Sequence, residues 1–503
     1  QNSMTTRLWS WKSVRLRVAV CIALALTIEG LMRSNLNMAM VCMLNETAIA
    51  EGRPAKSGLN ESLAAAKCEV LKFGNEKVYE YSGDLTWTSQ QRAVIFASFY
   101  AGGLLATLVT ENLNRWMGAK RLVLYGAIIN VVGTFATPTV ASYLGAVPMV
   151  ILRFVMGFGQ GLLWPCMSVL VGHWFPPTEK STALAIATTG NQLSVVIAMF
   201  ATAELCQVPF MGGWPMAFHV YGVLGVLLCI LWQVFVADDP ANARGITNEE
   251  IQVITDSAGR RPRVQRANWA QLLSSPVVWS IAGSAFAHNF ITVGTVTYLP
   301  LYYKTVLNMS LTSNGILSAL PFICQFVSKI LYAGFADESK KRSWMGFTSV
   351  TKACNSSASL GLAICFGLLC FCDCTYRWTA VFLVCMAMAF ISGYIPGYNT
   401  SVVSIAPSQT AAIAAFSRIW AQIASSLAPY EIGALTKQGI LEEWQIVFLT
   451  IVVICTITGL FFQISGSADV QPWDTVTCEE PKQELLEEKP ANGDSTVETN
   501  PTA

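Results

Sequence analysis

Twelve long apolar runs dominate this chain of 503 residues. A helix needs about 20 consecutive, mostly apolar residues to cross a bilayer, and each run reaches roughly that length. Because lipid cannot hydrogen-bond the backbone, an apolar run of this length spans as a helix. The sequence therefore predicts an all-α membrane protein with twelve transmembrane helices. The runs occupy residues 16–43, 91–111, 120–140, 146–171, 180–203, 216–237, 276–303, 313–335, 347–370, 377–400, 408–433 and 443–466.

Charged residues make up only 13% of the chain, about half of the share that soluble domains carry. This leaves too little polar surface to face water on all sides, so the lipid bilayer is the expected solvent. The formal net charge is +1, which gives no basic footprint for a nucleic acid. The three histidines lie far apart and the 15 cysteines follow no zinc spacing, so we expect neither a metal site nor a cofactor.

The apolar runs fall into two groups of six, separated by a polar stretch. This arrangement is typical of membrane proteins built from two parallel halves. We expect two six-helix bundles, over 16–237 and 273–467, joined by a cytoplasmic central loop over 238–272. The first bundle carries a luminal or extracellular loop at 44–88. The N-terminus over 1–15 and a disordered, acidic tail over 468–503 are both expected to be cytoplasmic.

Basic residues indicate which side of the membrane faces the cytoplasm. They gather before the first run, after the second and eighth runs, and in the central loop. All these segments lie on one side if the helices alternate, and the positive-inside rule makes that side cytoplasmic. Asn45 and Asn60 begin glycosylation sequons in the 44–88 loop, which agrees with a luminal or extracellular position. The pattern leaves open whether the membrane is the plasma membrane or a vesicular or lysosomal one.

Most cysteines lie in the apolar runs, where sulfur packs as a small apolar side chain. Five others lie at or between helix ends, namely Cys42, Cys68, Cys206, Cys372 and Cys374. One or two disulfides are possible among them, and free thiols are the alternative.

Two short connections carry an acid followed by basic residues. Glu111 and Arg115 follow the second run, and Asp337 to Arg342 follow the eighth. The two copies resemble the repeated signature of the major facilitator superfamily, in which the acid and arginines hold the cytoplasmic side shut. The resemblance implies a cytoplasmic gate that contains Arg115, Arg153, Asp337 and Arg342. Simple positively charged cytoplasmic turns are the alternative.

Further strings follow one another along nearly the whole chain. They include Arg33-Ser-Asn-Leu-Asn-Met, Arg153-Phe-Val-Met-Gly-Phe-Gly-Gln-Gly, Trp174-Phe-Pro-Pro-Thr-Glu-Lys-Ser and Gln471-Pro-Trp. This ordered set resembles the anion–cation symporter family of the major facilitators, which includes vesicular glutamate, sialic acid, nucleotide and sodium–phosphate carriers. The resemblance implies a secondary active transporter of small organic anions or phosphate, driven by a proton or sodium gradient or by the membrane potential.

Arg33 lies inside the first apolar run. A charge at that depth is costly and normally faces a cavity or a partner. Its guanidinium group matches a carboxylate or phosphate with two parallel hydrogen bonds. In the resembled family, an arginine at this position helps to bind the anion. The alternative is a structural ion pair with Glu29, which lies one helical turn earlier.

Glu29 and Gln160 depart from the pattern of the resembled family in opposite senses. Many members have a glutamate, tied to proton coupling, where this chain has Gln160, which cannot titrate. We hypothesise that Glu29 replaces it as the proton-sensitive carboxylate, or that the coupling differs. Glu29 as a mere counter-charge for Arg33 is the alternative.

Three residues of the second half complete the candidate binding site. His288 resembles in position the second substrate arginine of glutamate carriers, although it could equally pack between helices. Arg418 could clamp a dianion. It could also have a structural role, pairing with a distant acid or snorkelling, and we prefer this structural interpretation. Asn399 could contact the ligand or join two helices. Glutamate is the substrate that we least expect, because Phe96 also replaces a histidine of the glutamate carriers.

Other functions fit the sequence less well. A facilitative, uncoupled anion carrier and a channel-like or sensing protein of the same fold both remain open. A membrane enzyme is disfavoured, because the chain gathers no set of histidines, acids or cysteines in one place. No phosphate-binding loop of the P-loop pattern is present in the sequence, which argues against ATP-driven transport.

Overall fold

The computed structural model describes residues 13–45, 70–71, 83–175, 180–208, 213–243, 245–248, 250–252, 254 and 268–474. The predicted N-terminal segment before residue 13, most of the 44–88 loop with Asn60 and Cys68, and the tail beyond residue 474 lie outside the described residues. The predictions made for those segments therefore stay predictions.

Long helices follow the apolar runs closely. The first half contains α1 (Val14–Met43), α4 (Ser89–Met117), α5 (Ala119–Thr139), α6 (Ala146–Trp174), α7 (Lys180–Gln207) and α8 (Pro215–Phe235). The second half contains α11 (Pro276–Thr305), α12 (Leu311–Lys341), α13 (Phe347–Leu369), α14 (Arg377–Phe390) with its continuation α15 (Tyr398–Ser404), α16 (Thr410–Leu435) and α17 (Leu441–Ser465). The central loop contributes the short helix α10 (Trp269–Ser274).

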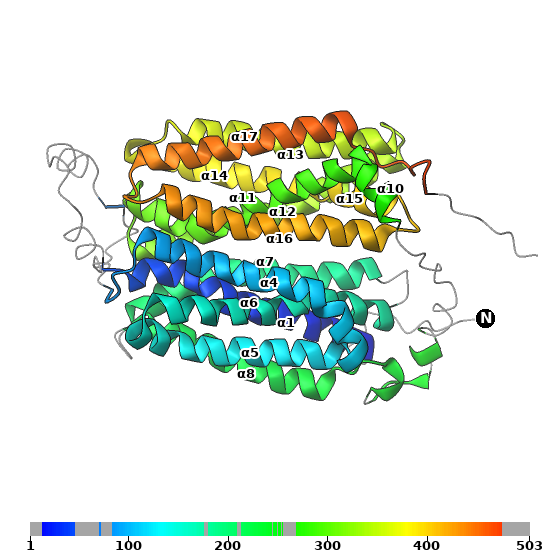
Figure 1. Cartoon of the computed structure of the whole chain (residues 1–503), viewed down its shortest axis with the longest axis horizontal. Helices are drawn as coiled ribbons and strands as arrows, with labels where there is room; N and C mark the ends of the chain where they lie inside the picture. The colour runs from blue at the N-terminus through cyan, green and yellow to red at the C-terminus, as the bar shows by residue number, and fades with distance from the viewer. Residues whose placement is uncertain are drawn as a thin grey trace, which may run out of the picture.

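Ten helical segments of the described chain are long and apolar enough to cross a membrane. The other two long helices, α1 and α16, carry the charged side chains of Glu29 and Arg33, and of Arg418. These two helices still occupy transmembrane positions, since they run alongside the others through the thickness of the molecule (Figure 1). Their charges therefore lie at the depth where a cavity or a polar partner is needed.

The helices form two bundles that lie side by side, one built from α1 to α8 and the other from α11 to α17 (Figure 1). The bundles meet along three pairs of helices, α1 with α11, α4 with α16 and α7 with α12. Within the first bundle, α4 and α6 pack so closely that an added Cβ on Gly157 would lie 1.7 Å from the carbonyl oxygen of Phe99. Glycine is required there because any side chain would meet backbone.

Contacts between the bundles concentrate at the end opposite the basic turns. Ser89 Oγ donates to the Lys437 carbonyl at 3.3 Å, and Lys304 Nζ donates to the Val41 carbonyl at 3.2 Å. Gln207 Nε2 donates to Thr312 Oγ1 at 2.7 Å at the same end. In this conformation these hydrogen bonds hold the bundles together at the end opposite the basic turns.

The central loop anchors the start of α1. Glu250 is buried, and its carboxylate accepts hydrogen bonds from Ser13 Oγ at 2.6 Å and from the Val14 backbone N–H at 3.3 Å. Arg15 Nε lies 3.6 Å from the same carboxylate. A negative charge at a helix N-terminus is favourable because it faces the positive end of the helix dipole.

The cysteine alternatives are partly resolved. Cys374 is disulfide-bonded, whereas Cys42, Cys206 and Cys372 are free thiols. The glycosylation candidate Asn45 lies just after α1, at the end of the bundle opposite the basic turns, and its backbone N–H donates to the Leu85 carbonyl at 2.9 Å. Its glycosylation stays a prediction.

Candidate functional site

A cavity of about 520 Å³ lies between the two bundles and is lined by helices of both. Five of the residues singled out in the sequence line it, namely Arg33, Gln160, His288, Asn399 and Arg418. Residues predicted from both halves of the chain therefore meet around one cavity, and their role in binding stays a prediction. Glu29 and the four proposed gate residues lie elsewhere.

Arg33 brings a positive charge into the cavity from α1. The side chain is half-buried, and its Nη2 donates to Asn191 Oδ1 of α7 at 3.1 Å. Within the described part of the chain, Arg33 has no ion pair with any acid. Its partner is a neutral amide, so the guanidinium charge is available to an anion in the cavity.

Glu29 faces away from the cavity, into the first bundle. The side chain is 1% exposed. Its Oε2 accepts a hydrogen bond from Asn130 Nδ2 of α5 at 2.8 Å, and its Oε1 has no hydrogen-bond partner among the described residues. A buried carboxyl group in this setting must be neutral or be matched by a nearby positive charge. The ion pair between Glu29 and Arg33, which was the alternative function of Arg33, does not form here.

Gln160 and Arg153 both belong to α6 but have different surroundings. Gln160 is 8% exposed and lines the cavity, and its Oε1 has no hydrogen-bond partner in the described chain. Arg153 is 2% exposed, and its guanidinium carbon lies 4.5 Å from the centre of the Phe99 ring. Arg153 therefore supports a wall of the cavity, since Phe99 lines it.

The other gate residues make local contacts in this conformation. Arg115 pairs with Glu111 at 2.5 Å, and Arg342 pairs with Glu338, each four residues away on the same helix. Both pairs are exposed, as is Asp337. Among the described residues no ion pair joins the two basic turns, so the gate stays a prediction for another conformation.

His288 is fixed by two tyrosines of the second bundle. Its Nδ1 lies 3.0 Å from the hydroxyl of Tyr398, and its ring stacks on Tyr394 with 5.3 Å between the ring centres. One ring nitrogen is thus engaged in helix packing while the side chain still lines the cavity. Asn399, the neighbour of Tyr398, lines the cavity from α15.

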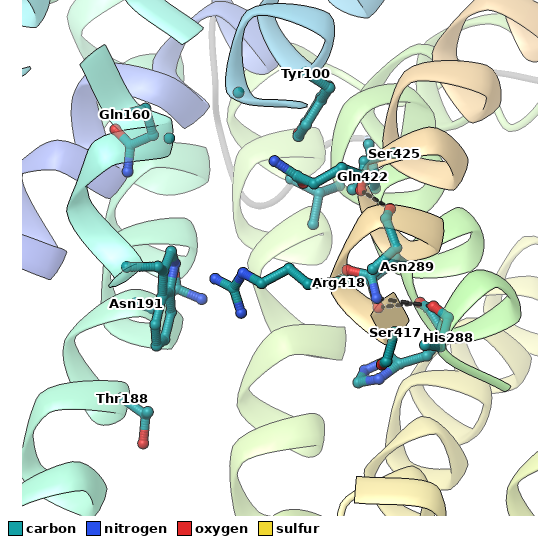
Figure 2. Close-up of a pocket in the computed structure, with 18 of the residues that line it drawn as sticks. Tyr100, Gln160, Thr188, Asn191, His288, Asn289, Ser417, Arg418, Gln422 and Ser425 are labelled. Atoms are coloured by element: carbon teal, nitrogen blue, oxygen red, sulfur yellow. Dashed lines mark hydrogen bonds between the residues drawn. The ribbon is translucent and has the colours of Figure 1, made fainter. Parts of the chain in front are cut away.

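Arg418 reaches across the cavity from α16 toward the first bundle. Figure 2 shows its guanidinium group pointing toward Asn191. The guanidinium carbon lies 5.4 Å from the centre of the Trp164 ring, which belongs to α6. Within the described chain it has no acidic partner, so pairing with a distant acid, one form of the structural role that we preferred from the sequence, is absent here.

Lys329 of α12 is a cavity residue that the sequence analysis missed. Its Nζ donates to Thr188 Oγ1 of α7 at 3.4 Å. The same rule that singled out Arg33, a charge inside an apolar run, would have found it. With Lys329, the cavity holds three cationic side chains, and none of its described lining residues is an aspartate or a glutamate. This arrangement can bind an anion. The described residues contain no group of three or more potential metal ligands.

Comparison with known proteins places this geometry in context. The sequence profile of the Major Facilitator Superfamily matches residues 22–429. A putative inorganic phosphate cotransporter of Drosophila melanogaster is 28% identical, with 94% of this chain and 88% of that protein covered. Human sialin is 26% identical over 92% of this chain and 91% of its own length. The mouse sodium-dependent phosphate transport protein 3 is 27% identical over 88% and 91%, respectively.

Solved structures confirm the fold predicted from the apolar runs. The crystal structure of a D-xylose–proton symporter superposes with a TM-score of 0.64 at 12% sequence identity, covering 91% of this chain and 99% of that one. At such low identity the likeness establishes the fold alone. The all-α membrane architecture and the resemblance read from the sequence strings are both confirmed.

Proposed function

This chain belongs to the major facilitator superfamily, and from that premise we propose that it carries a small anion across the membrane by alternating access. It is a membrane transporter related to sialin and to sodium–phosphate transport proteins. In the proposed cycle, the two bundles rock around the central cavity and expose it to each side in turn. The anion is a small organic anion or phosphate.

The observation that carries this proposal is the charge of the cavity. Arg33, Lys329 and Arg418 line it, and no described lining residue is acidic. Positive charges at membrane depth are costly when uncompensated. An anion in the cavity supplies the missing compensation and gains charge-assisted hydrogen bonds, which are the strong ones.

His288, Asn399 and Gln160 would complete the binding site. The imidazole and the amides offer neutral hydrogen-bond groups on the cavity wall, which can orient the anion once the cations have attracted it. Tyr398 would hold the His288 ring through the hydrogen bond at Nδ1. Arg33 then contributes from the first bundle, while His288 and Arg418 contribute from the second.

Glu29 is our candidate for the coupling group. It shares α1 with Arg33, yet it contacts Asn130 of α5 and not the cavity. Protonation of Glu29 would therefore alter how α1 packs in the first bundle, without a change of charge inside the cavity. A proton gradient acting through Glu29, a sodium gradient and the membrane potential alone are the three driving forces to be compared.

We take the end opposite the basic turns as the outer end. Three hydrogen bonds between the bundles lie there, so in the proposed cycle this conformation is closed at the outer end. The opposite state must close the cytoplasmic end, where Arg115, Asp337 and Arg342 are exposed. We propose that these residues make their gate contacts in that state, together with a change in the packing of Arg153.

The test is flux into liposomes that contain the purified full-length chain. Phosphate, sialate, glutamate, urate and nucleotides are offered separately under pH, sodium and voltage gradients. We expect saturable, gradient-driven uptake of at least one anion, with glutamate the weakest. Uptake that shows no saturation, or no dependence on any gradient, would favour a channel-like or facilitative protein.

Arg33→Gln supplies the variant and Arg121→Gln the matched control, since Arg121 is exposed on α5. A hydrogen bond to a charged group contributes about 1.5–3 kcal/mol, which corresponds to a roughly 10- to 100-fold loss of apparent affinity. We expect this loss for Arg33→Gln and unchanged affinity for Arg121→Gln. Equal affinities in the two variants would contradict the proposed role of Arg33. Localisation of the tagged chain in cells would decide between the plasma membrane and a vesicular or lysosomal membrane.

A further inference from the structure

Two cations from opposite bundles converge on a single turn of α7. Arg33 of α1 donates to Asn191, and Lys329 of α12 donates to Thr188. Thr188 and Asn191 are three residues apart, so they lie on the same face of α7, with Cβ atoms about 5–6 Å apart. The view of the cavity in Figure 2 shows both side chains on the same wall.

Arg418 approaches this wall from the other side. Its guanidinium group crosses the cavity toward Asn191 (Figure 2) and otherwise stacks near Trp164. Arg33, Lys329 and Arg418 are therefore three like charges that face one small space from three helices. Each is in contact with a neutral side chain, namely Asn191, Thr188 and Trp164, respectively.

Charge balance distinguishes between possible ligands. Against the three cations, a monoanion leaves two positive charges without compensation at membrane depth, which is costly, whereas a dianion leaves one. A dianion balances more of this charge. A dicarboxylate can place one group between Arg33 and Lys329 and the other on Arg418, and a phosphate monoester can share the oxygens of its one phosphoryl group among the three cations. An anion can displace the amide and hydroxyl acceptors, because a hydrogen bond between two ionised groups adds a charge attraction that a neutral acceptor does not supply.

We propose that the cavity selects its substrate by charge number, taking a small dianion such as a dicarboxylate or a phosphate monoester in preference to a monoanion of the same size. Lys329 is the specificity-determining residue, because it supplies the second cation at the Arg33 end. This inference rests on the proposed function, since it requires that the central cavity binds the transported anion.

The discriminating experiment compares ligands of similar size that differ by one negative charge. Succinate is paired with its monoamide, succinamate, and methyl phosphate is paired with dimethyl phosphate. Each compound is titrated at pH 7.8 against the purified full-length chain, and the rise in apparent melting temperature gives its affinity, because a ligand that binds the folded state stabilises it. Affinities are measured for the unsubstituted chain and for Lys329→Gln, Lys329→Arg and Lys341→Gln.

We expect the unsubstituted chain to bind the dianion of at least one pair ten or more times more tightly than its monoanionic partner. Lys329→Gln should reduce this preference to threefold or less, mainly by weakening the dianion. Lys329→Arg should keep the preference. Lys341→Gln, an exposed position on the same helix, should leave it unchanged.

The other outcomes separate the two proposals. If monoanions bind as tightly as dianions, or if Lys329→Gln keeps the full preference, the selection by charge number is wrong while the anion carrier stands. If no anion stabilises the chain and none is taken up by the liposomes, the proposed function fails, and this inference fails with it. If the Lys329→Gln protein does not fold, Lys329→Arg and the unsubstituted chain decide the question. The proposal is refuted if Lys329→Arg loses the preference for dianions, or if the unsubstituted chain shows no such preference.

Discussion

The contact between α4 and α6 allows a prediction whose size follows from the structure. A Cβ on Gly157 would lie 1.7 Å from the carbonyl oxygen of Phe99. Real Cβ atoms essentially never come within 3.0 Å of such an atom, so the two helices would have to separate by more than an ångström. Since the obstacle is backbone, no change of rotamer can relieve it. Gly157→Ala should therefore loosen the first bundle.

The expected cost combines two opposing effects. Overpacking a well-packed interior costs about 1–3 kcal/mol, and a backbone obstacle belongs at the upper end of that range. Alanine is favoured over glycine in a helix by about 1 kcal/mol, which offsets part of the cost. A net loss of about 2 kcal/mol corresponds to a fall of roughly 4–8 °C in melting temperature for a bundle of this size.

Gly172→Ala is the matched control, because Gly172 belongs to the same helix and an added Cβ would meet no atom within 4 Å. It should gain the helix-propensity term without the overpacking cost. Thermal denaturation of both detergent-purified variants, followed by size-exclusion chromatography, measures the difference. Transport by Gly157→Ala should also fall, because Phe99 lines the cavity and carries Arg153 on its ring. If Gly157→Ala were as stable as Gly172→Ala, the close approach of α4 and α6 would be wrong.

Three further predictions concern the proposed cycle. Glu29→Gln should remove most of the pH dependence of uptake while uptake itself persists; a pH profile identical to that of the unsubstituted chain would exclude Glu29 as the proton-sensitive group. Tyr398→Phe removes the partner of His288 Nδ1 and should weaken substrate affinity by roughly two- to tenfold, the equivalent of about 0.5–1.5 kcal/mol for one hydrogen bond; an unchanged KM would mean that His288 serves only in helix packing. Arg115→Gln should change the melting temperature little, because an exposed ion pair with Glu111 contributes about 0.2–1 kcal/mol. A lower uptake rate at unchanged stability would support a role of Arg115 in the gate. An unchanged uptake rate would exclude Arg115 from the gate.

The sequence predicted the helices well because bilayer thickness fixes the length of an apolar run. For example, α6 begins at Ala146 and α11 begins at Pro276, which are the first residues of the corresponding apolar runs. It also singled out Arg33, His288 and Arg418, which line the cavity, because a charge or an imidazole inside an apolar run is conspicuous. The sequence did not tell which way each side chain faces. That direction depends on the rotation of a helix about its axis, which packing against neighbouring helices determines.

Glu29 and Lys329 are two residues whose direction the sequence did not predict. Glu29 faces the interior of the first bundle, and Lys329 faces the cavity. Glu29 is one turn from Arg33, so helix geometry alone suggested an ion pair. The amide of Asn130, 101 residues away, instead accommodates Glu29 inside the first bundle. Lys329 lies inside the apolar run of α12, and its charge was a signal that the sequence analysis did not use. Thr188 of the other bundle holds it in the cavity. In both cases the decisive partner is a neutral polar residue that carries no signal in a hydropathy pattern, so the charge balance of the cavity could be read only after the bundles had been assembled.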